Sequence, residues 1–96
     1  MKIVIAGAGA VGTHLARMLS NDSQNVVLID PDEGRLFRLG SELNIMTLVR
    51  QPTSIQGMQD AEVQRADLFI AVTPDDSENL TCAMLAKQLG AKKTVA

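Results

Sequence analysis

Aromatic residues are almost absent from this 96-residue chain, which has two phenylalanines, Phe37 and Phe69, and no tryptophan or tyrosine. Proteins that bind single-stranded nucleic acid usually stack the bases on aromatic rings. A surplus of positive charge is also missing, because 9 lysines and arginines stand against 11 acidic residues, giving a net charge of −2. The composition therefore argues against nucleic acid as a partner. We expect both phenylalanines to lie in the core.

Cysteine occurs once, as Cys82, so no internal disulfide can form and a cytoplasmic location is favoured. Its place beside Ala83 and Met84 on an expected helix indicates a small buried side chain rather than a reactive thiol. Long hydrophobic runs are missing too. Only about five apolar residues precede the first glycine, too few for a signal peptide or a membrane span. Any membrane contact would come through a partner.

The length of 96 residues, 46% of them hydrophobic, indicates one domain over residues 1–96 with a single core. Apolar runs bounded by turn-forming residues recur at 3–6, 26–29, 45–49, 68–72 and 94–96. Short runs rich in valine and isoleucine predict strands buried on both faces, as in a parallel sheet. Because the last run ends the chain, we expect a piece of a longer protein, truncated at the fifth strand.

Helical spacing fills the gaps between these runs. The expected apolar stripes are Val11, Leu15, Met18 and Leu19, then Leu36, Leu39 and Leu43, then Leu80, Ala83, Met84 and Leu89. Pro52 and Gly57 limit the remaining connection to a short helix at about residues 54–60. This alternation predicts an α/β fold, a doubly wound, Rossmann-like parallel sheet in the order 3-2-1-4-5 between two helical layers.

Three glycines, Gly7, Gly9 and Gly12, are spaced G-x-G-x-x-G between the first strand and the first helix. We expect Gly7 to turn the chain with a positive φ, which glycine adopts without a Cβ clash. Gly9 would let a pyrophosphate approach the backbone, and Gly12 would let the helix lie close to the sheet. The main-chain N–H groups at the helix start would then face the phosphates.

Asp30 ends the second strand, where a carboxylate can accept hydrogen bonds from both ribose hydroxyls of an adenosine. Its charge would repel a 2′-phosphate, so the pattern favours NAD or ADP/ATP over NADP. The alternative is that Asp30, Pro31 and Asp32 only turn the chain and cap the next helix, a role that suits Asp32 best. Pro31 is placed beside Asp30 in the predicted pocket. Arg35 either reaches the adenosine side of that pocket or lies in solvent.

The segment "VTPDD" at residues 72–76 follows the fourth strand, at the point where strand order reverses. Ligands bind there in this architecture, so Thr73 and Pro74 are predicted to line the pocket. Asp75 and Asp76 begin the next helix, and two adjacent carboxylates without further ligands do not make a metal site. His14 has no paired acid or nucleophile and is interpreted as a helix surface residue. No catalytic residue is predicted.

Three segments resemble a known family, namely "KIVIAGAGAVGTHLARML", "VVLIDPDEGRL" and "ADLFIAVTPDDSENLTCAMLAKQLGAKKTVA". Together they are similar to the N-terminal nucleotide-binding domain of the regulatory subunit of Trk potassium-uptake systems, the RCK or KTN domain family. The last segment is the most discriminating, with Thr73, Asp76 and Asn79 followed by the ending "AxxLGAKK". The resemblance covers nearly the whole chain.

The resemblance implies a regulatory domain rather than an enzyme, binding NAD (NAD⁺/NADH) or ATP/ADP and gating a membrane potassium transporter or channel. It also implies a cytoplasmic protein held at the inner face of the membrane by that transporter, and assembly into dimers or larger rings. Carried over position by position, the nucleotide contacts fall on Gly7, Ala8, Gly9, Ala10, Val11, Gly12, Asp30, Thr73 and Pro74.

Two departures from the family pattern concern the same pocket. Ala10 stands where a longer polar residue is common, and Arg50-Gln51-Pro52 replaces a glycine-containing turn that forms part of the adenine wall. Arg50 either contacts the nucleotide, by stacking on adenine or pairing with phosphate, or lies in solvent. Two other functions share much of the pattern: the cofactor-binding half of an NAD-dependent oxidoreductase, and an oligomerisation module with a vestigial nucleotide site. A catalytic domain downstream would distinguish the first.

Overall fold

The computed structural model describes residues 1–96, in which strands and helices alternate along the chain. The elements are β1 (Lys2–Ala6), α1 (Ala10–Asn21), β2 (Asn25–Asp30), α2 (Glu33–Glu42), β3 (Met46–Val49), α3 (Ile55–Asp60), the 3-10 helix η1 (Val63–Arg65), β4 (Leu68–Ala71), α4 (Asp76–Leu89) and β5 (Thr94–Val95). All the predicted strands and helices form, and η1 is the one additional element. None of the helices combines the length and the apolar character needed to cross a membrane.

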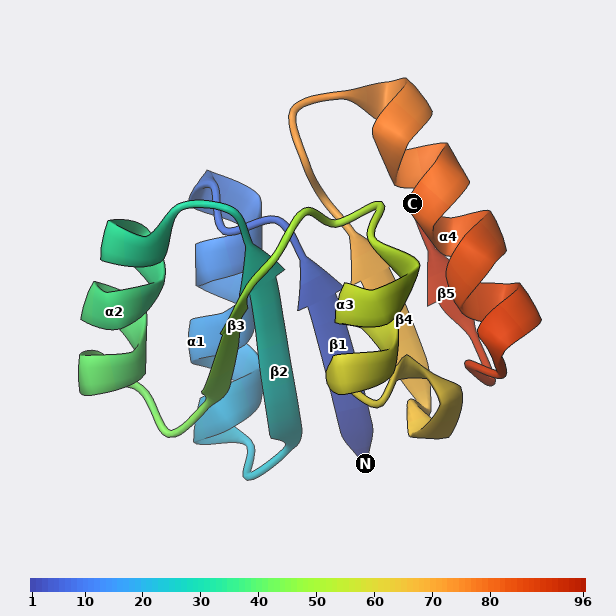
Figure 1. Cartoon of the computed structure of the whole chain (residues 1–96). Coiled ribbons are helices and arrows are strands. Elements are labelled where there is room, and N and C mark those ends of the chain that lie inside the picture. Colours follow the sequence, from blue (N-terminus) through green and yellow to red (C-terminus); the bar gives the residue numbers. More distant parts are fainter.

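The five strands form one parallel sheet in the order β3-β2-β1-β4-β5, as the sequence predicted (Figure 1). One face packs against α1 and α2 through a cluster around Ile5, Leu28 and Leu36. The opposite face packs against α3, η1 and α4 through a cluster around Phe69 and Cys82. The strand order reverses between β1 and β4, which leaves an opening where the chain leaves these two strands for separate faces.

Burial is complete in the centre of the sheet and fails at both edges, at β3 and at β5, where Val95 is exposed. Every residue from 3 to 6 and from 26 to 30 is buried. In β3, by contrast, Met46 and Val49 are exposed, so the expectation of burial on both faces is wrong for this strand. β3 has a neighbour on one side only, and an edge strand of four residues is too short to be covered throughout.

The predicted apolar stripe of α1 is half wrong. Leu15 and Leu19 contact the core, whereas Val11 and Met18 are exposed. The buried residues are the small ones, Gly12 and Ala16. A Cβ added to Gly12 would lie 1.8 Å from the carbonyl oxygen of Gly7, so the helix axis comes closer to the sheet than larger side chains would allow.

The predicted stripe of α4 is also half wrong, because Ala83 is buried and Leu89 packs against the core but the other two residues are not buried. Leu80 and Met84 are exposed, whereas Asn79, Cys82, Ala83 and Ala86 are buried. As in α1, small side chains face the sheet. The stripe of α2 is confirmed, because Leu36 and Leu39 are buried and Leu43 packs against them.

The two phenylalanines have different surroundings. Phe69 in β4 is fully buried, as predicted, but Phe37 in α2 is 75% exposed, so its expected place in the core is wrong. Leu36 and Leu39 occupy the inner face of α2, and the two positions between them, Phe37 and Arg38, lie on the outer side of the helix.

Candidate functional site

The turn after β1 has the geometry that the glycine pattern predicted. Gly7 has a φ of +114°, a region that residues with a side chain rarely adopt. A Cβ at this position would lie 2.8 Å from the carbonyl oxygen of Val72. The N–H of Gly7 donates to the carbonyl oxygen of Ile29 at 2.8 Å. Gly7 therefore shapes the turn and presses it against the loop that follows β4, and its own N–H is already used.

The first turn of α1 presents main-chain N–H groups that the helix itself cannot satisfy. Gly9 is the N-cap residue and offers no side-chain acceptor. The first hydrogen bond of the helix runs from the N–H of Thr13 to the carbonyl oxygen of Gly9 at 2.9 Å. The N–H groups of residues 10 to 12 precede it and have no helical acceptor. A Cβ at Gly9 would meet no atom within 4 Å, so the space in front of these groups is open to an anion.

Asp30 is buried, with 7% of its surface exposed, and its carboxylate faces the glycine turn. Its Oδ1 accepts a hydrogen bond from the N–H of Ala8 at 2.8 Å, and its Oδ2 accepts one from the N–H of Asp32 at 2.9 Å. Each carboxylate oxygen keeps a second lone pair that a ribose hydroxyl can use. The sequence predicted a ribose ligand and missed this second role, in which Asp30 ties the β1 and β2 loops together.

The residues after Asp30 start α2. The Oδ1 of Asp32 accepts a hydrogen bond from the N–H of Arg35 at 3.0 Å, which confirms that Asp32 is the N-cap. The guanidinium of Arg35 is half-exposed and lies 3.9 Å from the Oδ2 of Asp32. Arg35 is thus on the surface of the site, held only by a long ion pair.

The loop after β4 is fastened to α4 by Asn79, a buried polar residue. The Oδ1 of Asn79 accepts hydrogen bonds from the N–H of Thr73 at 2.7 Å and from its hydroxyl at 2.6 Å. The Nδ2 of Asn79 donates to the carbonyl oxygen of Thr73 at 2.9 Å. Asp75 caps α4 by accepting from the N–H of Glu78 at 3.1 Å, and Asp76 follows in the first turn, as predicted.

A pocket of about 290 Å³ lies at the carboxyl ends of the strands. It brings together five of the predicted residues, Asp30, Pro31, Arg35, Thr73 and Pro74. The other lining residues are Asp32, Gln51, Pro52 and Glu78. We call this cavity the strand-end pocket. The unusual turn after β3 therefore still supplies one wall, through Gln51 and Pro52.

Arg50 does not line the strand-end pocket. Its Nη1 donates to the carbonyl oxygen of Val49 at 2.8 Å, and its Nη2 lies 3.6 Å from the Oδ2 of Asp60 in α3. Its stem packs against Gly57, where an added Cβ would lie 2.9 Å from the Cβ of Arg50. The sequence left open either a nucleotide contact or a side chain in solvent for Arg50. The structure favours neither, because the Arg50 side chain connects the end of β3 to α3.

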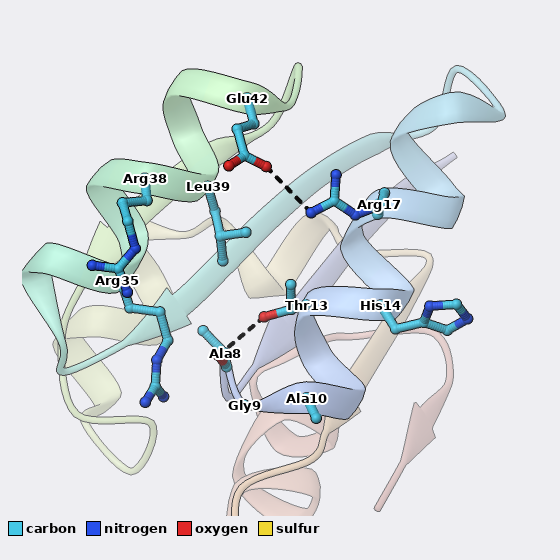
Figure 2. Close-up of a pocket in the computed structure, with 10 residues that line it drawn as sticks. All are labelled: Ala8, Gly9, Ala10, Thr13, His14, Arg17, Arg35, Arg38, Leu39 and Glu42. Carbon is cyan, nitrogen blue, oxygen red and sulfur yellow. Dashed lines mark hydrogen bonds and ion pairs between the residues drawn. The ribbon is translucent and has the colours of Figure 1, made fainter.

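A second cavity of about 480 Å³ lies between α1 and α2 and is shown in Figure 2. Its lining residues are Ala8, Gly9, Ala10, Thr13, His14, Arg17, Arg35, Arg38, Leu39 and Glu42. We call it the helix groove. Arg35 lines both cavities. His14 is exposed at the rim and points away from α2, in keeping with its interpretation as a surface residue (Figure 2).

Three predicted site residues, Gly7, Val11 and Gly12, line neither cavity. Gly7 and Gly12 lack a Cβ and so allow neighbouring backbone segments to approach closely. Val11 offers a main-chain N–H, and its side chain is exposed. Sequence reasoning gave Asn79 no role and did not single out Arg38. The signal available for Asn79 was the family resemblance, in which it stands with Thr73 and Asp76 in the most discriminating segment.

Comparison with known proteins links the whole chain to potassium-uptake systems. Residues 3–96 match the family described as TrkA-N domain. The chain is 42% identical over 95 residues to a Trk system potassium uptake protein TrkA homolog of Archaeoglobus fulgidus, covering 99% of this chain and 21% of that protein. It is 32% identical over 96 residues to a protein with the same name from Methanothermobacter thermautotrophicus, covering 100% of this chain and 44% of that protein. The chain thus spans less than half of either relative.

Solved structures share the fold at lower sequence identity. A Kef CTD of Shewanella denitrificans in AMP-bound form aligns with a TM-score of 0.84 at 16% identity, covering 99% of this chain and 57% of that chain. The NAD(P)-binding domain of an exopolyphosphatase-related protein of Archaeoglobus fulgidus aligns with a TM-score of 0.82 at 18% identity, covering 97% and 70%. The TrkA-N domain of the Escherichia coli inner membrane protein ybaL gives 0.72 at 17%, covering 98% and 85%.

Proposed function

The chain belongs to the TrkA-N domain family, and from that premise we propose that it is the nucleotide-sensing part of a regulator of potassium uptake. Its ligand would be an adenine nucleotide, NAD(H) or ATP/ADP, and its occupancy would control an associated membrane transporter. Under this proposal the domain works at the cytoplasmic face of the membrane, held there by the transporter, and self-associates. Binding rather than catalysis is its function.

The observation that carries this proposal is the convergence of the loops after β2, β3 and β4 on the strand-end pocket, together with the turn after β1, which is attached to two of these loops. The turn after β1 contacts the loop after β4 through Gly7 and Val72. The same turn is bound to the end of β2 through Ala8 and Asp30. A ligand in this pocket therefore touches loops that are already connected, and any movement that it causes is passed among them.

The residues present fit an adenine nucleotide. The N–H groups at the start of α1 suit a diphosphate, because they lack helical acceptors and lie at the positive end of the helix dipole. Asp30 retains lone pairs for the ribose hydroxyls, and Gln51, Pro52 and Pro74 supply walls for the base. The bound nucleotide would not react. Different nucleotides would be distinguished by the charge and the length of the part beyond the first ribose.

Regulation requires that two ligands differ in their affinity for two states of the domain, since equal affinity shifts no equilibrium. The route from the site to the rest of the fold starts at Thr73, which is hydrogen-bonded to Asn79 in α4. A ligand against Thr73 would therefore act on the position of α4. Protection of α4 amides from hydrogen exchange, measured with each nucleotide, tests this step.

The binding step is tested by calorimetric titration of NAD⁺, NADH, ADP and ATP against wild type, Gly9→Ala and Gly40→Ala. A Cβ at Gly9 meets no protein atom, so the variant should fold normally while its methyl group blocks the diphosphate. We expect an affinity at least tenfold lower, about 1.4 kcal/mol. Gly40→Ala is the matched control, because its Cβ makes only an ordinary contact at 3.5 Å with Thr47 in β3.

Two results would count against the proposal. Absence of binding by all four nucleotides to the wild type would leave a domain without a ligand. Equal affinities of wild type and Gly9→Ala would show that the nucleotide lies elsewhere.

A further inference from the structure

One carboxylate in the strand-end pocket has no partner in the protein. Glu78, in the first turn of α4, lines this pocket and is half-buried. It takes part in none of the salt bridges of the structure. Arg35, the one cation that lines the pocket, pairs with Asp32 instead. A half-buried carboxylate has lost part of its hydration, so a ligand that supplies hydrogen-bond donors would bind it favourably.

The cap of α4 explains why the Glu78 side chain is free. A glutamate three residues after the N-cap usually closes a capping box, in which its carboxylate accepts from the N–H of the N-cap residue. In this protein the N–H of Asp75, the N-cap, donates to the Oγ1 of Thr73 at 3.3 Å. The hydrogen bond that Glu78 does make, to the Oδ1 of Asp75, uses its main-chain N–H. Thr73 has therefore taken the structural role that the carboxylate would otherwise have.

Glu78 is on the side of α4 that faces the sheet, because it lies one turn before the buried Cys82. α4 begins at the end of the sheet where the strands finish, as Figure 1 shows, so this side chain lies near the loops that leave the strands. The same pocket is lined by Gln51 and Pro52, from the turn after β3. Its lining thus combines Glu78 with residues that follow three different strands.

Under the proposed function, the base of the nucleotide occupies this part of the site. The diphosphate lies at the N–H groups that begin α1, and Asp30 binds the ribose. None of residues 7–12 lines the strand-end pocket, whereas Asp30 does. The base and the diphosphate leave the ribose from different carbon atoms, so the base extends from Asp30 into the pocket that contains Glu78.

We propose that Glu78 recognises the base, its carboxylate accepting a hydrogen bond from the 6-amino group of adenine. This inference rests on the proposed function, because the ribose and diphosphate contacts assigned there place the base. An ionised carboxylate only accepts hydrogen bonds, and the 6-amino group supplies two N–H donors. A purine without that group leaves the carboxylate without a donor, so Glu78 makes the pocket selective for adenine.

The test uses whichever of NAD⁺, NADH, ADP and ATP binds the wild type most tightly. Calorimetry compares it with an analogue in which hydrogen replaces the 6-amino group, and with its guanine counterpart, whose N1–H and 2-amino group also donate to a carboxylate. The proteins are wild type, Glu78→Ala and Asp76→Ala. Asp76 is the matched control, because it is the other acidic residue in the first turn of α4 and does not line the pocket.

Wild type should bind the adenine nucleotide about tenfold more tightly than the analogue without the amino group, the effect of one charge-assisted hydrogen bond. Removal of a negative charge alters the affinity for every anionic nucleotide, so the ratio of the two affinities is the quantity compared. Glu78→Ala should bind the nucleotide and its analogue equally. Asp76→Ala should keep the tenfold ratio of wild type.

The assignment is refuted if wild type binds the nucleotide and its analogue equally, or if Glu78→Ala keeps the wild-type ratio. It is also refuted if Asp76→Ala loses the preference as fully as Glu78→Ala, because the effect would then be one of charge at the start of α4. Tighter binding of the guanine counterpart by wild type would exclude adenine as the base. In each of these cases a nucleotide still binds, whereas failure of the proposed function means that none of the four does.

Discussion

The main-chain N–H of Ala8 donates a 2.8 Å hydrogen bond to the Oδ1 of Asp30, across the buried boundary between β1 and β2. This bond joins the turn that would hold the diphosphate to the carboxylate that would hold the ribose. Under the proposed function Asp30 would have two roles, since its oxygens satisfy main-chain groups of the protein and retain lone pairs for a ligand. A change at Asp30 must affect stability as well as binding.

Asp30→Ala should lower the free energy of unfolding by ~2–4 kcal/mol, because it leaves the buried N–H of Ala8 and the N–H of Asp32 without their acceptor. Urea unfolding measures this loss. Asp22→Ala is the control, an exposed aspartate at the end of α1. A variant as stable as wild type would show that the Ala8 bond does not hold the turn.

Gly12→Ala should destabilise the fold by ~3 kcal/mol or more, since the added Cβ would lie 1.8 Å from the main-chain oxygen of Gly7. The oxygen of Gly7 and the Cα that carries the new Cβ both belong to backbone that is fixed by the sheet and by α1, so neither can move without breaking hydrogen bonds. Thermal unfolding monitored by circular dichroism provides the measurement. A melting temperature within a degree of wild type would mean that α1 can shift freely.

Asn79→Ala should cost ~2 kcal/mol, because the N–H and the carbonyl oxygen of Thr73 both lose a partner. We also expect weaker nucleotide binding, since the loop that lines the strand-end pocket would no longer be fastened to α4. Asn44→Ala, at an exposed position before β3, serves as the comparison. Unfolding and calorimetry on the same preparations separate the two effects, and unchanged binding would contradict the role assigned to Asn79.

Lowering the pH should reduce the free energy of unfolding, because Asp67 becomes protonated. The N–H of Lys2 donates to its Oδ2 at 2.8 Å, and the Nζ of Lys92 lies 3.3 Å from its Oδ1. These contacts, the backbone hydrogen bond first, lower the pKa of Asp67 below its ordinary value of 3.8. A lowered pKa in the folded state gives stability that is full above the unfolded value and is lost as pH falls through the folded one.

The corresponding measurement is urea unfolding of wild type and Asp67→Asn between neutral pH and acid. Wild-type stability should begin to fall once pH drops below about 4, and the variant should show a smaller fall over that range. Parallel curves for the two proteins would assign the acid sensitivity to other carboxylates.

Cys82 should resist alkylation as long as the protein is folded. Burial, and secondarily the charge of Glu78, raises the pKa of its thiol to about 11, so almost no thiolate is present at pH 8. Iodoacetamide should react with native protein far more slowly than with protein in urea, followed by mass spectrometry. Equal rates would show that α4 opens readily from the sheet.

The topology could be predicted from the sequence because each central strand is a continuous apolar run and each turn has its own signal. Gly7, Asp30 and Thr73 were placed by the same logic, since they end strands that must meet at one edge. The buried faces of α1 and α4 could not be predicted from the largest apolar residues. Both helices approach the sheet through small side chains, Gly12 and Ala86 among them, and such close packing depends on tertiary contacts.

Two features of the site, the contacts of Asp30 and the helix groove, could not be predicted for a related reason. The double role of Asp30 depends on the N–H of Ala8 pointing toward β2, and that direction is set by the positive φ of Gly7. The helix groove depends on how α1 and α2 lie side by side. Neither relationship is encoded in the spacing of residues along one segment.

Because Ala8 and Asp30 are hydrogen-bonded to each other, the loops after β1 and β2 are held together before any ligand binds. They become ordered as the chain folds, so under the proposed function a ligand would meet a preformed site and little conformational entropy would be lost when it binds. Association should then approach the rate of simple diffusional docking, with a small heat-capacity change from the ligand's own buried surface. The fraction of ligand-bound domain would then follow changes in ligand concentration quickly, because no slow rearrangement would precede binding.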